Sequence, residues 1–253
     1  MKKRLDVVLV DRGLAHSRTQ AQALVLAGLV PGHDKPGEQI DAAADLRVLR
    51  PPRFVSRGGE KLAHALEELA ISVEGAECLD LGASTGGFTD CLLQRGAARV
   101  IAVDVGRGQL HPKVRDDPRV VVLERANARE LQELPYRPGF ITCDVSFISV
   151  RTALPPALGL AISGWQALVL VKPQFEAGRA QAPKGVVRDP GVHGRVLREV
   201  ANAALDWEAR TAGVVDSGLP GPKGNREFFL HLVHADYPTL PDELDHWIDE
   251  AVA

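Results

Sequence analysis

The chain has 253 residues, of which 45% are hydrophobic and 25% are charged, a composition typical of folded globular proteins. It contains no run of about 18 apolar residues that could span a bilayer. Asp6 and Asp11 interrupt the apolar run that a signal peptide needs. Three cysteines without Cys-x-x-Cys spacing argue against a disulfide framework and a zinc knuckle. We therefore expect a cytoplasmic protein with neither a membrane nor a metal as partner.

Charge is distributed unevenly, although the formal net charge is only −3. Residues 1–60 carry ten Lys and Arg against seven Asp and Glu, whereas the rest of the chain carries 20 basic and 26 acidic side chains. A basic N-terminal segment favours a polyanionic partner such as a nucleic acid. Ordinary variation of surface charge is the alternative explanation.

Residues 4–29 are predicted to form two short helices, because apolar residues recur there at helical spacing. Ser17 is placed to cap the second helix, with Gln20 three residues later in a capping-box pattern. Further on, residues 46–49 alternate between apolar and polar side chains like a short strand. The chain is thus divided into three predicted parts: a small α+β module over 1–50, a linker over 51–60 and a large domain over 61–253.

Beyond residue 60 the predicted elements alternate between strands and helices. Strands are predicted near residues 77–81, 99–103, 119–123, 139–143, 166–171, 211–216 and 226–234, and helices over 60–70 and 190–209. The run Ala167–Val171 is apolar throughout, as expected of a central parallel strand that is buried on both faces. We therefore predict an α/β fold with a doubly wound, Rossmann-like sheet, which binds ligands outside the carboxyl ends of its strands.

A glycine-rich turn, residues 80–89 (DLGASTGGFT), follows the first of these strands. Its glycines let the backbone approach a ligand, and a side chain at Gly86 is expected to fill that space. The spacing differs from Gly-x-Gly-x-x-Gly, and the P-loop lysine is absent, which disfavours a pyrophosphate ligand. The next strand ends at Asp104, where a carboxylate would meet ribose hydroxyls.

This pattern resembles the S-adenosylmethionine site of Rossmann-like methyltransferases. A glycine-rich turn without any ligand is the alternative. The predicted cofactor contacts are Asp80, Gly82, Ser84, Thr85, Gly86, Gly87, Phe88, Asp104, Val105, Asn127 and Asp144.

Four charged residues stand at predicted strand ends or close to them: Lys61, Asp144, Lys172 and Glu227. Lys172 follows five apolar residues and precedes a proline, which is unusual for a surface lysine. With their neighbours, the four residues resemble the Lys-Asp-Lys-Glu tetrad of FtsJ-like ribose 2′-O-methyltransferases. Their order and local sequence are similar to the TlyA family, in which an αL-type RNA-binding module precedes an FtsJ-like domain. Two unrelated surface ion pairs are the alternative.

The resemblance implies methylation of a ribose 2′-hydroxyl in ribosomal RNA, with a cytidine as the expected target and ribosomal subunits as partners. Lys172 would accept the hydroxyl proton with Lys61 as its helper, while Asp144 and Glu227 orient the two ammonium groups. A lysine can act as a base only if its pKa falls well below about 10.4. Burial and a neighbouring cation both act in that direction.

The resemblance also assigns the RNA contacts. These are predicted at Arg4, Ser17, Arg18 and Arg57. Arg18 stands in the first turn of a predicted helix, where it and the free N–H groups could face phosphates. The alternative is that Arg18 only pairs with Asp6 or Asp11 on the surface of the module.

Three other functions fit part of the sequence. The chain could methylate a small molecule or a protein, although the basic module and the tetrad argue against that substrate class. It could be a non-catalytic RNA-binding or ribosome-assembly factor, which would not bind S-adenosylmethionine. A secreted cytolysin is the poorest fit, because the sequence has neither a signal peptide nor an amphipathic segment suited to membranes.

Overall fold

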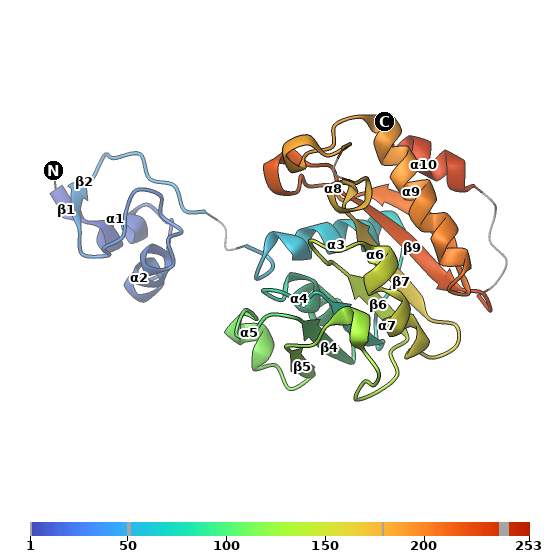
Figure 1. Cartoon of the computed structure of the whole chain (residues 1–253). Coiled ribbons are helices and arrows are strands. Elements are labelled where there is room, and N and C mark those ends of the chain that lie inside the picture. The colour runs from blue at the N-terminus through green and yellow to red at the C-terminus, as the bar shows by residue number, and fades with distance from the viewer. Residues whose placement is uncertain (1, 50–51, 179, 238–242) are drawn as a thin grey trace. The chain divides into compact units, whose positions relative to one another are not determined.

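The computed structural model describes residues 2–49, 52–178, 180–237 and 243–253. It separates into two compact units, Met1–Arg53 and Phe54–Ala253 (Figure 1). The predicted boundary between residues 50 and 51 lies outside the described residues. Within the described ranges, no helix combines the length and the apolar character needed to cross a membrane.

The N-terminal unit is a small α+β fold. Its elements are β1 (Lys2–Arg4), α1 (Leu5–Asp11), α2 (Arg18–Leu26) and β2 (Gln39–Asp41). The two helices correspond to those predicted over residues 4–29. The strands β1 and β2 pair antiparallel, with Lys3 opposite Ile40, and neither was predicted. Leu5, Leu9 and Val25 are completely or almost completely buried, so the helices pack on a core of their own.

The strand predicted at residues 46–49 is wrong. Among the described residues the segment forms no ladder with another strand, and the N–H of Leu49 donates a hydrogen bond to the carbonyl oxygen of Leu29 at 2.7 Å. The alternation of apolar and polar side chains at residues 46–49 does not come from pairing in a sheet. Leu46 is buried on the core of the unit, whereas Arg47 and Leu49 are exposed. Alternating burial therefore arises here in a segment that is not itself a strand.

The C-terminal unit is built on a seven-stranded sheet. Its strands are β3 (Glu77–Leu81), β4 (Arg99–Asp104), β5 (Val120–Glu124), β6 (Phe140–Cys143), β7 (Gln166–Val171), β8 (Ala209–Asp216) and β9 (Phe228–His234). They lie in the order β5-β4-β3-β6-β7-β9-β8, and β9 is antiparallel to both of its neighbours. The predicted α/β, Rossmann-like sheet is confirmed, whereas the reversed direction of β9 was not predicted.

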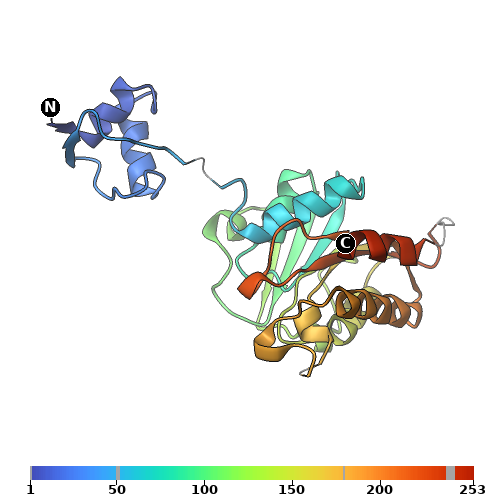
Figure 2. The ribbon, with the colours of Figure 1, turned by 90° about the horizontal axis from the view of Figure 1, so that it is seen from above.

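Helices cover both faces of this sheet (Figure 2). The α-helices are α3 (Arg57–Glu68), α4 (Gly87–Gln94), α5 (Pro112–Arg115), α6 (Val150–Ala153), α7 (Pro155–Gly159), α8 (Pro173–Glu176), α9 (Pro190–Leu205) and α10 (Leu244–Val252). Three short 3₁₀ turns are η1 (Ala128–Glu130), η2 (Pro183–Gly185) and η3 (Pro222–Gly224). One apolar core joins α3 and α4 to the sheet, and a second core lies between the sheet and α6, α7, α9 and α10.

The strand order places the loops that can bind a ligand. From β3 the chain proceeds outward through β4 to β5, and it then returns to the other side of β3 with β6 and β7. The order therefore reverses between β3 and β6, and the loops after these two strands diverge at the same edge of the sheet. The glycine-rich turn follows β3, and Asp144 follows β6. Both lie where a doubly wound sheet binds its ligand.

Candidate functional site

The turn between β3 and α4 depends on two glycines with positive φ. Gly82 has a φ of 86°, and a Cβ atom on it would lie 2.6 Å from the carbonyl oxygen of Asp144. Gly86 has a φ of 91° and caps α4, and a Cβ atom there would lie 2.8 Å from Leu110 Cδ1. A side chain at Gly86 would thus meet the core around Leu110 and Val114 rather than the ligand's space, which corrects the expectation for this residue.

A cavity of about 500 Å³ opens at the carboxyl ends of β3, β4 and β6. Six of the predicted cofactor residues line it: Gly82, Ser84, Asp104, Val105, Asn127 and Asp144. The carboxylate of Asp104 accepts hydrogen bonds from the N–H groups of Ser84, at 2.8 Å, and of Gly106, at 2.6 Å. This carboxylate is therefore held at the end of β4, at the edge of the cavity where it can accept from a ribose hydroxyl.

Asp80 has a different environment from the one that its place in the motif suggests. Its side chain is completely buried and lines neither this cavity nor the one described next. The carboxyl accepts hydrogen bonds from the hydroxyls of Thr89, at 2.6 Å, and Thr142, at 3.0 Å. Burial raises the pKa of Asp80 to about 6, although these hydrogen bonds favour the charged form. Asp80 thus links the start of α4 and strand β6 to the end of β3 through these hydrogen bonds, and it does not face the ligand.

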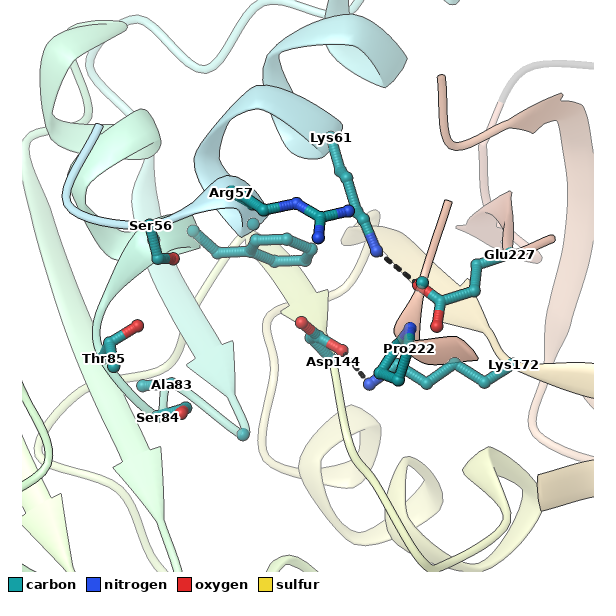
Figure 3. Close-up of a pocket in the computed structure, with 15 residues that line it drawn as sticks. Ser56, Arg57, Lys61, Ala83, Ser84, Thr85, Asp144, Lys172, Pro222 and Glu227 are labelled. Carbon is teal, nitrogen blue, oxygen red and sulfur yellow. Dashed lines mark hydrogen bonds and ion pairs between the residues drawn. The ribbon is translucent and has the colours of Figure 1, made fainter. Parts of the chain in front are cut away.

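A second cavity of about 270 Å³ is drawn in Figure 3. It adjoins the first cavity, because Gly82, Ser84 and Asp144 line both. The predicted cofactor residues Thr85, Gly87 and Phe88 line this cavity and not the larger one. All four predicted tetrad residues line it as well: Lys61, Asp144, Lys172 and Glu227. They come from α3, from the loop after β6, from the end of β7 and from the start of β9, so the fold brings together groups up to 166 residues apart.

The four charges form two ion pairs with one lysine in each. Lys61 Nζ lies 2.5 Å from Glu227 Oε2, and Lys172 Nζ lies 2.5 Å from Asp144 Oδ1 (Figure 3). The side chain of Glu227 is completely buried, and those of the two lysines are only 9% and 11% exposed. The Asp144 side chain is 26% exposed, so the pair of Lys61 and Glu227 is the more enclosed of the two. In both pairs the carboxylate constrains the position of its ammonium group.

Sequence reasoning missed two polar groups beside the tetrad. The hydroxyl of Ser146 accepts a hydrogen bond from Lys172 at 2.9 Å, so Lys172 is held from two sides. Gln174 donates through its Nε2 to the second oxygen of Glu227 at 3.4 Å. The signal for both was their place in the motifs Asp-Val-Ser-Phe and Lys-Pro-Gln-Phe at strand ends, although neither motif specifies what its serine or glutamine contacts.

Phe147 was also missed, and its exposure makes it notable. It has a φ of 65°, which is uncommon for a residue with a side chain, and it is 90% exposed while lining the larger cavity. Its ring lies 5.1 Å from that of Phe175, between ring centres. An exposed aromatic ring at the edge of a site can stack on a nucleobase. The only signal in the sequence was an aromatic residue shortly after a strand end.

In the N-terminal unit, two of the predicted RNA-binding residues share one buried carboxylate, that of Asp6. Arg4 donates to both Asp6 oxygens, at 3.0 and 2.9 Å, and Arg18 donates to Oδ2 at 3.1 Å. Gln22 adds a fourth hydrogen bond at 2.8 Å. The hydrogen bonds from Arg4 above all hold the pKa of Asp6 well below its usual range, despite complete burial of the side chain. Arg18 therefore does pair with Asp6, as in the alternative that the sequence left open to RNA binding.

These ion pairs leave both arginines accessible to another anion. The side chains of Arg4 and Arg18 are 44% and 57% exposed, and two guanidinium groups share one carboxylate. The cluster thus keeps one excess positive charge. Ser17 caps α2 by accepting from the N–H of Gln20 at 3.2 Å, as the capping pattern predicts. The fourth predicted RNA contact, Arg57, lines the smaller cavity of the other unit and donates to the carbonyl oxygen of Pro220.

Comparison with known proteins shows which class of protein the chain belongs to. Residues 54–234 match the FtsJ-like methyltransferase family, and residues 3–30 match the S4 domain. A solved S-adenosylmethionine-dependent methyltransferase from Listeria monocytogenes has the same fold, with a TM-score of 0.50 at 15% identity over 71% of this chain and 99% of that one. The larger unit is therefore a methyltransferase, and its cofactor is S-adenosylmethionine.

More similar proteins define the family. The chain is 48% identical over 240 residues to the 16S/23S rRNA (cytidine-2′-O)-methyltransferase TlyA of Mycobacterium tuberculosis, covering 91% of this chain and 90% of that protein. It is 38% identical to Hemolysin A of Brachyspira hyodysenteriae, over 91% of this chain and 99% of that one. A solved structure with a hemolysin name from Streptococcus thermophilus superposes with a TM-score of 0.75 at 42% identity, over 99% and 95% of the two chains. The chain belongs to the TlyA family of methyltransferases.

Proposed function

We propose that the protein methylates a ribose 2′-hydroxyl of ribosomal RNA, at a cytidine, with S-adenosylmethionine as methyl donor. The observation that carries this proposal is the pair of lysine–carboxylate ion pairs in a cavity that adjoins the larger cavity at the strand ends. The TlyA relative at 48% identity is named for this reaction. A ribosomal substrate also implies that the protein works in the cytoplasm.

The larger cavity suits S-adenosylmethionine. Asp104 would accept from the ribose hydroxyls of the cofactor, and Asn127 lines the same cavity. The shared residues Gly82 and Asp144 would stand between the cofactor and the substrate. When bound, S-adenosylmethionine supplies a methyl group on a sulfonium ion, which an oxygen nucleophile attacks in line. The remaining task of the protein is to place that oxygen and remove its proton.

We assign the proton acceptor to Lys172. Nζ of Lys172 accepts a proton only in the uncharged form, so the ammonium group must first lose one proton from its ion pair with Asp144. As the 2′-oxygen then forms its bond to the methyl carbon, the hydroxyl proton passes to this nitrogen. Asp144 and Ser146 fix the position of this nitrogen, at 2.5 and 2.9 Å. Lys61, whose position is fixed by Glu227, helps to orient the ribose. The exposed ring of Phe147 is placed to stack on a base at the entrance.

We assign binding of the RNA backbone to the module over residues 1–50, through Arg4, Arg18 and the free N–H groups at the start of α2. Phosphate contacts fix the register of a protein on RNA without reading its bases. The excess positive charge around Asp6 supports this assignment. The larger unit, Phe54–Ala253, then performs catalysis, with Arg57 at its RNA-facing cavity.

The experiment that tests this function uses ribosomal subunits that lack the modification. The full chain is incubated with the subunits and isotope-labelled S-adenosylmethionine, and the RNA is digested to nucleosides for mass spectrometry. We expect label in 2′-O-methylcytidine. Label in a methylated base, or in ribosomal protein with none in RNA, would overturn the proposal. The Lys172→Ala protein serves as the control for contaminating activity.

A further inference from the structure

Two identical Pro-Lys-Gly tripeptides form turns of the same shape in the larger unit, and we call them the twin turns. They are η2 (Pro183–Gly185) and η3 (Pro222–Gly224). Lys184 and Lys223 both have a φ of 57°, and the glycines that follow have φ values of 75° and 77°. A left-handed conformation costs a residue with a side chain on the order of 1 kcal/mol, so it persists only where the surroundings enforce it.

A buried asparagine holds the twin turns together. Asn225 is 2% exposed, and its Oδ1 accepts from the N–H of Val187 at 3.1 Å. Its Nδ2 donates to the carbonyl oxygens of Gly185 and Pro222, both at 3.0 Å. Lys223 Nζ adds a hydrogen bond to the carbonyl oxygen of Lys184 at 3.0 Å. Three of these hydrogen bonds join two segments that are almost 40 residues apart in sequence, and the bond from Asn225 to Pro222 closes the second turn, so the two turns form one surface.

This surface borders the catalytic cavity. Pro222 lines the cavity that contains the tetrad, and Glu227 follows Asn225 by two residues. On the other side, Gly185 lines a further hollow of about 410 Å³, together with Phe147 and Gln174. A nucleic acid strand that places one ribose at Lys172 must therefore pass close to the twin turns.

The charge of the twin turns is not neutralised by the protein. Lys184 and Lys223 are both exposed, and neither forms an ion pair with any carboxylate in the part of the chain that the structure describes. The tetrad lysines Lys61 and Lys172, by contrast, each have a carboxylate at 2.5 Å. Two lysines that stand on a fixed backbone and have no acidic partner among the described residues are suited to bind an anion.

We infer that the twin turns bind backbone phosphates of the RNA strand that flank the methylated nucleotide. This inference rests on the proposed function, because it takes the substrate to be RNA. Each phosphate contact made by a lysine releases condensed counterions and steepens the salt dependence of binding by about 0.7–0.9 on logarithmic axes. The twin turns therefore determine affinity and its salt dependence, and they leave the chemical step unchanged.

The test replaces the two lysines by asparagine, which removes their charges and tolerates the left-handed backbone better than most residues. Binding of the Lys184→Asn/Lys223→Asn protein to a naked fragment of ribosomal RNA is measured at several salt concentrations. We expect weaker binding and a slope that is smaller by about 1.4–1.8. The single-turnover rate at saturating RNA and the affinity for S-adenosylmethionine should equal those of the unaltered protein.

The matched control removes two charges from the opposite edge of the sheet. Arg99 begins β4 and Arg119 immediately precedes β5, and their side chains are 44% and 43% exposed. The Arg99→Gln/Arg119→Gln protein should keep its affinity and slope. If the lysine variant also keeps both, the inference is overturned. A loss seen with intact subunits but not with naked RNA would overturn it too, because an acidic protein would then be the partner. Absence of RNA methylation by the unaltered protein would instead refute the proposed function.

Discussion

The Asp6 cluster and the tetrad both place cations beside carboxylates, but in different proportions. In the cluster, two guanidinium groups share one carboxylate and remain about half exposed. In the tetrad, each of two lysines has its own carboxylate, and both ammonium groups are nearly buried. An excess of accessible positive charge favours binding of a phosphate chain, whereas balanced and enclosed pairs fix the position of reacting groups. The comparison predicts that one region controls binding and the other the chemical step.

The largest effect is expected at Lys172. The Lys172→Arg substitution keeps a positive charge beside Asp144 but removes the ability to accept a proton, because a guanidinium group stays protonated. We expect the single-turnover rate to fall by about 10²–10⁴, with affinity for S-adenosylmethionine within threefold of the unaltered protein by calorimetry. Lys61→Arg is the matched variant and should lose less than tenfold. Equal losses in the two variants would show that the two lysines do not have different roles.

Asp80 provides the contrasting case of a buried carboxyl without a cation beside it, since its partners are the hydroxyls of Thr89 and Thr142. Its pKa in the folded protein is about 6, against 3.8 for the ordinary group, so the folded state binds the proton more tightly. The free energy of unfolding should therefore fall as the pH rises from 4 to 6, by about 3 kcal/mol for this group.

Urea unfolding of the unaltered protein and the Asp80→Asn variant across that pH range measures this contribution. In the variant, the free energy of unfolding should depend less steeply on pH over this range, since the amide of asparagine does not titrate. Identical slopes in the two proteins would mean that Asp80 is charged in the folded state, and the contrast with the cation-paired Asp6 would not hold.

Asp104 tests whether the larger cavity holds the cofactor. Asp104→Ala should weaken binding of S-adenosylmethionine by ~1.5–3 kcal/mol, because hydrogen bonds to a charged carboxylate are lost. Glu124→Gln is the control, since Glu124 ends the next strand and is occupied by the N–H of Gly108 and by Arg115. Calorimetry should show little change for the control. Comparable losses in both variants would contradict the assignment of the ribose contact to Asp104.

The smallest effect is expected at Asp6. Whether its substitution weakens or strengthens RNA binding distinguishes two roles for this carboxylate. Removal of a negative charge should by itself strengthen RNA binding. If Asp6 instead positions Arg4 and Arg18, Asp6→Asn should weaken RNA binding by about 1 kcal/mol, the value of one hydrogen bond. Asp11→Asn is the control, because Asp11 pairs with Lys3 on the surface and is 48% exposed. Tighter binding by both variants would show that charge alone matters at Asp6.

Much of this architecture could be predicted from the sequence because local patterns determine it. The apolar run of β7 and the capping residue Ser17 each depend on near neighbours, and both lie where the sequence indicates. The contacts of Asp80 and the direction of β9 depend instead on packing between distant elements. Pattern analysis places a residue at a strand end, but it does not determine whether the side chain faces a cavity or the core.

The site residues divide in the same way. The tetrad was predictable as a set, because each member stands in a motif of its own. Its pairing was not predictable, since Lys61 and Glu227 are 166 residues apart in sequence and meet only in the folded chain. The twin turns were not recognised as a unit, because a shared tripeptide is too short to stand out as a repeat. Their association is visible only in the hydrogen bonds of Asn225.

The division of labour between the two regions is tested most directly by single-turnover methylation of ribosomal RNA over a range of RNA concentrations. Two variants are measured together, Arg4→Ala/Arg18→Ala and Lys172→Ala. We predict that the arginine variant needs more RNA to reach half of its maximal rate and keeps that maximal rate. The lysine variant should keep the half-saturating concentration and lose the rate. If both variants change the same parameter, the assignment of binding to the Asp6 cluster and of chemistry to the tetrad is wrong.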